Sequence, residues 1–486
     1  MIFNLENYNL TREEVTYDVC VFGAGPAGIS LALKLQNKRV LICEAGDLDY
    51  SEKSQDCYRG NVIGDEYFDL DITRLRYFGG SSNHWGGWCR TFNEMDFKRN
   101  DIGQYLVWPV NKKDIDPFFN ETVNIIGLPN PDRLTYKESI SKNYELESIK
   151  FDYSGTRFNT KYFEFFKKNK NIDLILNANL KKLNLEGNII KSCDLVSYNS
   201  STKKIKAKIF VFAMGGIENS RQLLWQQKIN NEKLYDKQIP VGKYWMEHPH
   251  YTLGNLVLKK KFINLPMFKR SKIEEVKFVQ LKYNIQKKLN ILSCGLRLEW
   301  PGYTDAKQII ADLSCYAPKL SKEIYELFNQ NLMCAARIRA AWEQLPIIDN
   351  NIELSLNERD KFNIPRPILN WKKNSFDKKT IKASLEYFSQ FLLDEDMGRL
   401  QIDDWVINSN QYPVDDEKAG HHHMGGTRMH VSKKFGVVDE NCKVYGSSNL
   451  YCAGSSIFTT GGHNNPTFPI IQFSLRLGDY LSKKKI

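Results

Sequence analysis

The sequence predicts an α/β protein that joins a Rossmann-like dinucleotide-binding domain to a substrate-binding domain of sheets and helices. Residues 17–46 show an apolar strand, a glycine-rich turn, a helix and a second strand, in that order. Another buried strand, at 209–213, runs into a pair of glycines. Between 251 and 410, short strands alternate with helical stretches and no glycine fingerprint is present. The first pattern favours a parallel sheet and the second an α+β arrangement. At 486 residues the chain has room for roughly two to four domains.

The stretch 17–46 carries a fingerprint for binding the pyrophosphate of a dinucleotide. Gly23, Gly25 and Gly28 follow the first apolar run with the spacing G-x-G-x-x-G, and Glu44 ends the second run. The first glycine permits a tight turn, the second lets the backbone approach the pyrophosphate, and the third lets the helix pack on the strand. The phosphates then face the helix N-terminus. Glu44 is placed to accept hydrogen bonds from a ribose, which argues against a 2′-phosphate there. These residues leave NAD and FAD both possible.

Glycine-rich and apolar patterns predict the remaining elements. A segment with four glycines, at 78–90, cannot be the interior of a regular helix or strand, so we expect a tight loop against a planar ligand. Residues 100–165 are predicted to be mainly helical with loops. Further strands are predicted at 172–213, with turns at 186–188 and 199–201, and at 252–258, 290–298, 351–356 and 368–371. Further helices are predicted at 218–226, 324–344, 378–394 and 468–482.

Composition bounds the kind of protein and its compartment. Hydrophobic content of 42% and aromatic content of 12% fit a folded globular enzyme. The net charge of +11 comes from short lysine clusters without interleaved aromatic residues, so no nucleic-acid partner is predicted. Ten cysteines without C-x-x-C pairs fit buried thiols in a reducing cytoplasm. No apolar run approaches the roughly 20 residues of a membrane span, and no secretory signal is seen, so we expect a cytoplasmic protein.

The histidines gather in loops that bracket the substrate block. All eight lie in glycine-rich or turn-rich segments: His84, His248, His250, His421, His422, His423, His430 and His463. Histidine suits proton transfer near neutral pH, so this distribution suggests one site built from distant segments. The run of three histidines at 421–423 is not expected to bind a metal, because adjacent loop histidines rarely point at one ion and no matching acid or cysteine cluster is evident.

Several motifs together resemble those of glucose-methanol-choline (GMC) oxidoreductases, a family of FAD-dependent alcohol and sugar oxidoreductases. Besides the fingerprint, they are GGSSNHWGG at 79–87, AMGGIENSRQLL at 213–224, EHPH at 247–250, HHMGGTRM at 422–429, NLYCAGSS at 449–456 and GHNNPTFP at 462–469. The resemblance covers both ends and the middle of the chain and is loose over 251–410. It implies FAD as the cofactor. The sequence agrees, because no second fingerprint for NAD(P)H is visible.

The resemblance also implies which residues hold the cofactor. They are Gly23, Gly25, Gly28, Glu44, Gly80, Ser81, Asn83, His84, Gly454, Pro466 and Thr467. His84 has two possible roles. Some family members attach FAD covalently through a histidine at this place in the loop, whereas in others the ring packs against the isoalloxazine without a bond.

For catalysis the resemblance places a base at His422 and its partner at Asn465, before Pro466. Oxidising an alcohol removes the hydroxyl proton and passes a hydride to flavin N5. A neutral histidine can take the proton, and an amide opposite it can hold the substrate oxygen and orient the C–H bond. His463 is an alternative partner, although the Asn-Pro-Thr sequence at 465–467 matches the family better.

The substrate class follows from finer similarity. The His-Trp pair at 84–85 and the motif at 422–429 resemble the pyranose oxidase and fructose dehydrogenase branch, which implies a carbohydrate substrate oxidised at a CH–OH group. A sterol or aromatic alcohol is the alternative. An NAD(P)H-dependent flavin reductase or monooxygenase, and a flavoprotein without activity, are disfavoured. Trp245, Trp300 and Trp371 are candidates for stacking on a sugar, although core packing is the expected role of each. The expected electron acceptor is oxygen, a quinone or a protein.

The implied domain division is discontinuous. Residues 1–100, 166–250 and 411–486 are predicted to form the FAD-binding domain, and residues 101–165 and 251–410 the substrate-binding domain.

Overall fold

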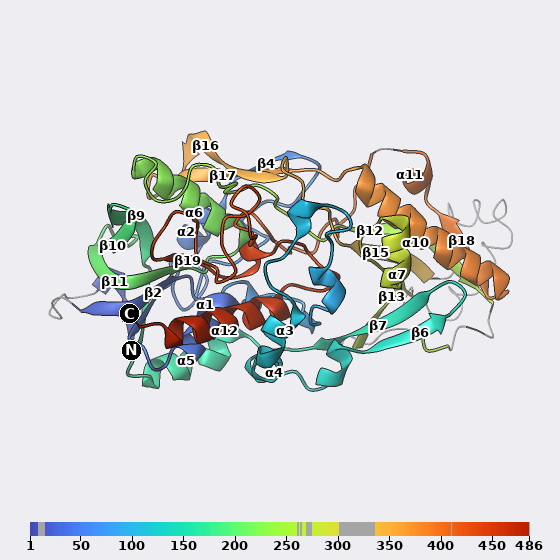
Figure 1. Ribbon diagram of the computed structural model, residues 1–486, viewed down its shortest axis with the longest axis horizontal. Helices are drawn as coiled ribbons and strands as arrows, with labels where there is room; N and C mark the ends of the chain where they lie inside the picture. Colours follow the sequence, from blue (N-terminus) through green and yellow to red (C-terminus); the bar gives the residue numbers. More distant parts are fainter. Residues whose placement is uncertain are drawn as a thin grey trace, which may run out of the picture.

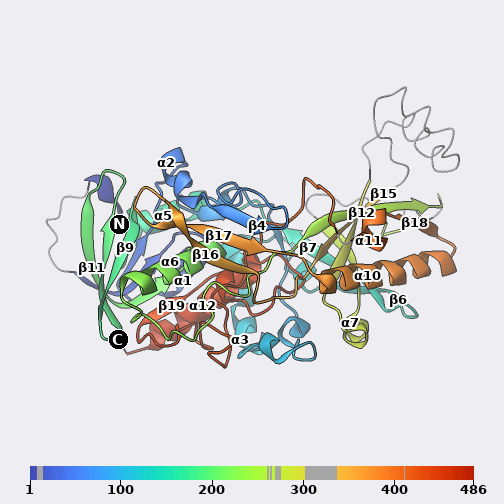
Figure 2. The same cartoon turned by 90° about the horizontal axis from the view of Figure 1, so that it is seen from above.

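The computed structural model describes residues 1–7, 15–259, 262, 265–268, 275–300, 336–409 and 411–485. Figures 1 and 2 show an elongated molecule with a mixed sheet at one end and an antiparallel sheet at the other. Both termini lie at the end that holds the mixed sheet. The mixed α/β architecture predicted from the sequence is confirmed.

The first sheet is built around the fingerprint strand. Its order is β1 (Ile2–Asn4), β8 (Ile172–Leu176), β3 (Val40–Cys43), β2 (Thr16–Phe22), β11 (Thr202–Phe212), β10 (Ile189–Val196) and β9 (Asn179–Glu186), and β19 (Leu450–Cys452) also pairs with β11. Strands β1, β8, β3, β2 and β11 run parallel to one another, and β19 is parallel to β11. Strands β9, β10 and β11 form antiparallel hairpins. The carboxyl ends of β2, β3 and β11 therefore meet at one edge, where α/β proteins bind ligands.

Helices from both ends of the chain accompany this sheet. They are α1 (Pro26–Lys34), α4 (Phe119–Ile126), α5 (Phe158–Lys168), α6 (Gly216–Ile229) and α12 (Thr467–Lys483), with the short α2 (Glu52–Gln55) and α3 (Lys112–Ile115). Helices α1 and α12 pack together so closely that a Cβ added at Gly478 would lie 2.7 Å from the Cβ of Lys34. This contact ties the C-terminal segment to the fingerprint helix.

The second sheet is wholly antiparallel. Its order is β18 (Gly398–Ile402), β12 (His250–Leu258), β15 (Ala336–Trp342), β14 (Cys294–Glu299), β13 (Glu275–Leu281), β7 (Leu146–Tyr153) and β5 (Trp88–Cys89), with β6 (Lys137–Ser141) beside β7. Helix α10 (Ser375–Asp394) packs on it, α7 (Tyr283–Leu289) connects β13 to β14, and α11 (Asp404–Ile407) follows β18 and contacts α10. Ile381, Leu385 and Phe388 of α10 belong to the core that this sheet shares with the helix.

A third, small sheet joins segments far apart in the sequence. It consists of β4 (Asn61–Gly64), β17 (Pro365–Trp371) and β16 (Asn351–Arg359), and β16 lies against α6. Trp245 and Trp371 are fully buried in the core beneath it. Trp300 is partly buried and donates its indole N–H to the carbonyl of Phe268. Core packing is thus confirmed for the first two tryptophans.

Most predicted elements are present, and three expectations are wrong. Within the region 100–165, predicted to be mainly helical, residues 137–153 form strands β6 and β7. Strand β7 is stabilised by pairing with β13, which lies more than a hundred residues away in the sequence. The end of the predicted helix 324–344 is instead β15, a central strand between β12 and β14, and its residues before 336 lie outside the described ones. The strand predicted at 290–298 begins only at Cys294.

Three further observations concern the domain division, membrane-spanning helices and the cysteines. Trp108, Ile115 and Leu134 belong to the core around the first sheet, whereas β6 and β7 join the second sheet. The division into a cofactor domain and a substrate domain stays a prediction, with residues 106–134 packed on the cofactor side. Within the described residues no helix is long and apolar enough to cross a bilayer. The eight described cysteines are buried free thiols.

Candidate active site

Two cavities meet at the residues predicted to be catalytic. The larger has a volume of about 430 Å³ and the smaller about 200 Å³. His422 and Asn465 line both cavities, together with Gly86, Trp88 and Gly420. A molecule in one cavity would therefore share these walls with a molecule in the other.

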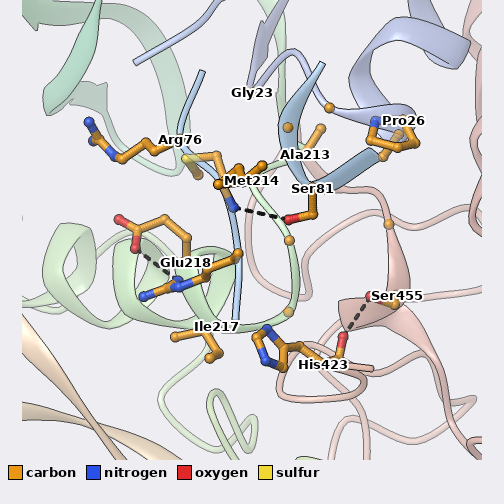
Figure 3. Close-up of a pocket in the computed structure, with 18 of the residues that line it drawn as sticks. Gly23, Pro26, Arg76, Ser81, Ala213, Met214, Ile217, Glu218, His423 and Ser455 are labelled. Atoms are coloured by element: carbon orange, nitrogen blue, oxygen red, sulfur yellow. Dashed lines mark hydrogen bonds and ion pairs between the residues drawn. The ribbon is translucent and has the colours of Figure 1, made fainter. Parts of the chain in front are cut away.

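The larger cavity lies at the carboxyl edge of the parallel strands. Its wall contains the turn between β2 and α1, the end of β3 and the turn after β11 (Figure 3). Gly23 has a φ of +102°, and a Cβ there would lie 2.6 Å from the carbonyl oxygen of Ala213. A Cβ at Gly28 would lie 2.0 Å from the carbonyl oxygen of Gly23. Both glycines are therefore required by close backbone packing, as the fingerprint predicts.

Other glycines leave room for a ligand. A Cβ added at Gly215 or Gly86 would meet nothing within 4 Å, and one at Gly25 would meet only Gly80, at 4.0 Å. Helix α1 begins at Pro26 without a side-chain cap, so its first turn presents backbone N–H groups and a positive dipole end to the cavity. An open, glycine-lined wall beside a helix N-terminus fits the diphosphate of a dinucleotide.

Glu44 and its neighbours add charge to this cavity. The buried Glu44 carboxylate accepts hydrogen bonds from the backbone N–H groups of Ala24 and Gly46, each at 2.9 Å. It therefore braces the glycine turn as well as lining the cavity. Arg76 and Glu218, which the sequence did not single out, also line it, as Figure 3 shows.

Nine of the eleven predicted cofactor residues line the larger cavity: Gly23, Gly25, Glu44, Gly80, Ser81, His84, Gly454, Pro466 and Thr467. Gly28 packs behind the turn instead. Asn83 donates its side-chain N–H to the carbonyl of Phe78 and braces the loop. His84 is exposed at the cavity wall, but desolvation of its ring by the surrounding loop, followed by the charge of Arg157, lowers its pKa.

The three consecutive histidines point to different partners. His421 lies edge-on to Phe68, with ring centroids 4.6 Å apart, and His423 Nε2 lies 3.1 Å from the hydroxyl of Tyr67. His422 turns toward His248. No group of three or more His, Cys, Asp or Glu side chains among the described residues is arranged to hold a metal ion.

His422 is held by a pair of residues from the EHPH segment. Its Nδ1 lies 2.9 Å from Nδ1 of His248, and its backbone N–H donates to Glu247 Oε1 at 2.7 Å. Glu247 also accepts the backbone N–H of His248 and the hydroxyl of Tyr67. Burial, followed by the neighbouring histidines, lowers the pKa of His422 well below its usual value, so the ring is neutral at physiological pH. Burial raises the pKa of Glu247 to about 7.

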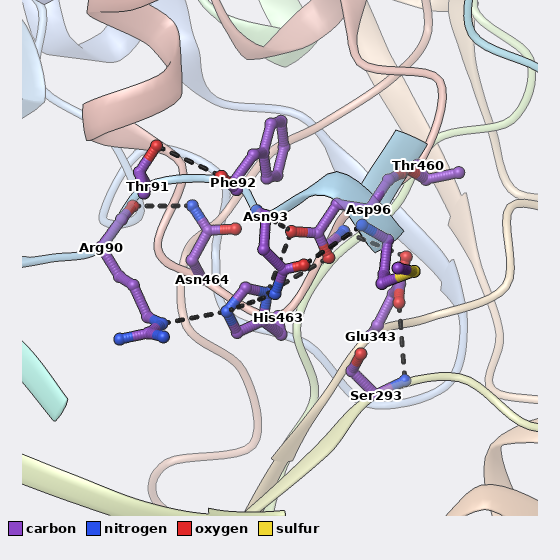
Figure 4. A network of polar contacts seen from close by, with 12 residues as sticks. Arg90, Thr91, Phe92, Asn93, Asp96, Ser293, Glu343, Thr460, His463 and Asn464 are labelled. Atoms are coloured by element: carbon purple, nitrogen blue, oxygen red, sulfur yellow. Dashed lines mark hydrogen bonds and ion pairs between the residues drawn. The ribbon is translucent and has the colours of Figure 1, made fainter. Parts of the chain in front are cut away.

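The two candidates for the catalytic partner differ in their surroundings. Asn465 donates its amide N–H to the carbonyl of Trp88 at 3.0 Å. His463 is held between two charged groups, with Arg90 Nε donating to its Nε2 at 3.0 Å and its Nδ1 3.0 Å from Asp96 Oδ2 (Figure 4). Its side chain is 3% exposed. Because both ring nitrogens of His463 already have strong partners, the geometry favours Asn465 for contact with a substrate oxygen.

The smaller cavity has an apolar wall and a polar wall. Its apolar wall consists of Trp88, Ile149, Phe151, Phe278 and Trp342, and its polar wall includes His248, His250, Arg297, Arg339 and Glu343. Arg297 pairs with Glu299 and Glu417, and Arg339 pairs with Asp415. The arginines are therefore neutralised by protein carboxylates, so the polar wall offers hydrogen bonds to a neutral polar molecule.

Comparisons with known proteins agree with the motifs. A family model described as GMC oxidoreductase matches residues 349–474. The comparison supports the GMC oxidoreductase family. A 2-methyl-1,2-propanediol dehydrogenase from Mycolicibacterium austroafricanum is 20% identical over 540 residues, covering 96% of this chain and 95% of that protein. FAD is the cofactor that the GMC assignment supports, in agreement with the glycine-lined cavity.

Solved structures share the GMC fold with this chain. A pyridoxine 4-oxidase from Mesorbium loti has a TM-score of 0.56 at 14% identity, covering 95% of this chain and 98% of that one. A formate oxidase of Aspergillus oryzae RIB40, studied for FAD modification, has a TM-score of 0.54 at 15% identity, covering 96% and 98%. Such low identities show the fold alone. The names of these relatives refer to a diol, pyridoxine and formate, so the pyranose oxidase and fructose dehydrogenase branch is not confirmed.

Proposed function

We propose that the chain is an FAD-dependent oxidoreductase that oxidises a CH–OH group of a carbohydrate to a carbonyl. The observation that carries this proposal is the meeting of the two cavities at His422 and Asn465. When bound, FAD supplies the acceptor for the hydride. Gly25, Gly80 and Glu44 are placed to hold the cofactor in the larger cavity, and the substrate occupies the smaller one.

The chain's own residues divide the remaining work. Neutral His422 takes the hydroxyl proton of the substrate, because a buried imidazole with a lowered pKa keeps its lone pair at physiological pH. Asn465, whose amide already donates one N–H to the carbonyl of Trp88, donates its other N–H to the substrate oxygen and fixes the direction of the C–H bond. Apolar side chains of the smaller cavity exclude water from this contact.

The shape and lining of the smaller cavity support a sugar-sized substrate. A sugar ring has an apolar face and a polar rim, which match the aromatic wall at Trp88 and Phe278 and the polar wall at His250 and Arg297. The volume of about 200 Å³ is below the roughly 300–1,000 Å³ of pockets for drug-sized ligands, which disfavours a sterol. The electrons then pass to oxygen, a quinone or a protein.

Anaerobic mixing with a substrate panel tests this proposal. The panel contains D-glucose, D-xylose and methyl α-D-glucopyranoside as carbohydrates, and benzyl alcohol, cholesterol and 2-methyl-1,2-propanediol as other alcohols. We expect a carbohydrate to bleach the visible absorbance of the flavin. Bleaching by another alcohol alone would overturn the carbohydrate assignment. The protein is also mixed separately with NADPH, and bleaching by NADPH but by no alcohol would overturn alcohol oxidation. Admission of air then shows whether oxygen reoxidises the flavin.

A further inference from the structure

The tautomer of His248 is determined by a backbone carbonyl. Its Nε2 lies 2.9 Å from the carbonyl oxygen of Gly462. A carbonyl oxygen can only accept a hydrogen bond, so Nε2 carries the hydrogen. Burial lowers the pKa of His248 to about 4, which keeps the ring neutral at physiological pH. The other nitrogen, Nδ1, therefore carries a lone pair and can only accept.

This assignment determines the tautomer of His422 in turn. The Nδ1 atoms of His248 and His422 are 2.9 Å apart, which is a hydrogen-bond distance. Because Nδ1 of His248 is an acceptor, Nδ1 of His422 must be the donor. In the neutral ring of His422, Nε2 is then the nitrogen without a hydrogen.

We propose that His248 is a positioning residue that holds His422 in the Nδ1–H tautomer, so that Nε2 is the atom that accepts the substrate proton. The role of His422 as the base rests on the proposed function, whereas the tautomer assignment rests on the hydrogen bonds alone. Both rings border the smaller cavity, and His422 also borders the larger one.

Buried charges fix the far end of this chain of hydrogen bonds. The backbone N–H of Gly462 donates to Glu343 Oε1 at 3.0 Å, and Glu343 pairs with Arg99 at 3.0 Å. The Glu343 and Arg99 side chains are each 1% exposed. Figure 4 shows Glu343 beside the loop that carries His463 and Asn464. The bond to Glu343 anchors the backbone of Gly462 next to His248, so the residue that supplies the carbonyl is itself held by a buried hydrogen bond.

Loss of the hydrogen-bond acceptor at His248 would favour the tautomer of His422 that cannot take the substrate proton at Nε2. A buried Nδ1–H of His422 without a partner is unfavourable, so the hydrogen would move to Nε2. An imidazole with hydrogen on Nε2 has no lone pair at the atom that must take the proton. A substitution at His248 is therefore expected to act through His422 without touching the substrate oxygen.

Nuclear magnetic resonance on the FAD-loaded protein with ¹⁵N-labelled histidine tests the proposal directly. Two-bond nitrogen–proton correlations distinguish a protonated ring nitrogen from a bare one. We expect His422, assigned by loss of its signals in His422→Gln, to carry hydrogen on Nδ1. His430 is an internal reference of the opposite kind, because its Nε2 donates to the carbonyl of Gln104 and its Nδ1 accepts from Ser432. A wild-type His422 with hydrogen on Nε2 would overturn the proposal, whatever the variants show.

Two substitutions at His248 sharpen the test. In His248→Leu the acceptor is lost, and we expect the hydrogen of His422 to move to Nε2 while the His430 signals stay unchanged. In His248→Asn the amide oxygen replaces Nδ1 as an acceptor, and we expect His422 to keep Nδ1–H. An unchanged His422 tautomer in a folded His248→Leu variant would contradict the proposal.

Kinetics separate this proposal from the proposed function. For a panel sugar that bleaches the flavin, we expect His248→Leu to slow flavin reduction roughly 10- to 100-fold at saturating substrate, with recovery in His248→Asn. An equal loss in both variants would contradict the positioning role. If the predicted tautomers are found but no alcohol of the panel reduces the flavin, the proposed function fails and the role of His248 stands.

Discussion

The two cavities are adjacent, but the chain builds them in different ways. At the strand ends the larger is lined by glycine backbone that either packs closely or leaves space for a ligand, beside side chains such as Arg76 and His84. The smaller is formed by side chains from β5, β7, β12, β13, β14 and β15 and from the loops around 420 and 463. A site made of backbone depends on a few glycines, whereas a site made of side chains depends on contacts between distant segments.

The largest effect is expected where a side chain would enter the backbone-built cavity. We expect Gly25→Val to abolish FAD binding, because its backbone is not strained but the added methyl groups would occupy the space for the pyrophosphate. The visible absorbance of the purified protein measures this loss. Gly155→Val is the control, since Gly155 is exposed and lies outside both cavities. A yellow Gly25→Val protein would show that the cofactor does not lie against this turn.

Removal of the base should have the next largest effect. We expect His422→Ala to lower the rate of flavin reduction by at least roughly 100-fold, the usual scale for a general base, while the protein keeps its FAD. Anaerobic stopped-flow measurement of flavin absorbance with a panel sugar gives this rate. The control is His430→Ala, which changes a buried histidine outside both cavities. In this variant we expect the flavin to be reduced at the wild-type rate. An unchanged rate in His422→Ala would remove this residue from the mechanism.

Substitutions at Asn465 and His463, which lie close together in the segment 462–469, are expected to affect different properties: the first activity and the second stability. We expect Asn465→Ala to lower the rate of flavin reduction roughly tenfold or more with little change in unfolding temperature. His463→Ala should lower the free energy of unfolding by about 1–3 kcal/mol, because it leaves the Arg90 and Asp96 side chains without their buried partner. Rates and thermal unfolding measured on both variants check the pair. The reverse pattern would make His463 the catalytic partner.

The pH dependence of stability tests the carboxylate that holds the catalytic loop. Burial raises the pKa of Glu247 from 4.5 to about 7, so the folded protein binds this proton more tightly than the unfolded chain. Its contribution to stability is full below about pH 4.5 and is lost as the pH rises through about 7. In Glu247→Gln the amide keeps the backbone hydrogen bonds and donates to Tyr67. We expect the variant to lose less stability than the wild type between pH 5 and pH 7.5 in chemical unfolding. Equal slopes would contradict the raised pKa.

The smallest effect on binding is expected at His84, on the wall of the larger cavity. His84 would hold FAD covalently if its neutral ring nitrogen replaced a hydrogen on a methyl carbon of the flavin. That bond would release two protons, one from the methyl group and one from the ring N–H, and two electrons to the electron acceptor. We expect the wild-type flavin to stay with the acid-precipitated protein, and the flavin of His84→Ala to bind but to be released by acid. Release from the wild type would mean that the ring only packs against the cofactor.

The sequence predicts the backbone-built part well because its signals are local. Gly23 and Gly28 have the structural positions that their spacing implies, since a tight turn and close helix packing leave glycine as the only choice. The contact of Glu44 with a ribose stays a prediction. Helices α1, α6, α10 and α12 lie close to the predicted ranges because each begins directly after a glycine, asparagine or proline that local sequence marks as a turn or cap.

The side-chain-built part could not be predicted in the same way. Nothing near Glu247 in the sequence indicates that its carboxylate binds the backbone of His422 and the hydroxyl of Tyr67. The pair of Arg99 and Glu343 is separated by more than 200 residues. Strand β15 has an alanine- and arginine-rich sequence with good helix propensity, and only its place between two strands makes it a strand. These features depend on tertiary contacts that local patterns do not encode.

The proposed function requires that a carbinol C–H bond breaks at the junction of the two cavities while His422 holds the proton. The most direct measurement is the rate of anaerobic flavin reduction by the fastest panel sugar, compared with the same sugar deuterated at the oxidised carbon. We expect slower bleaching with the deuterated sugar, and in His422→Ala only a small residual rate of bleaching with either form. Equal rates for the two sugars, together with an undiminished rate in the variant, would contradict it.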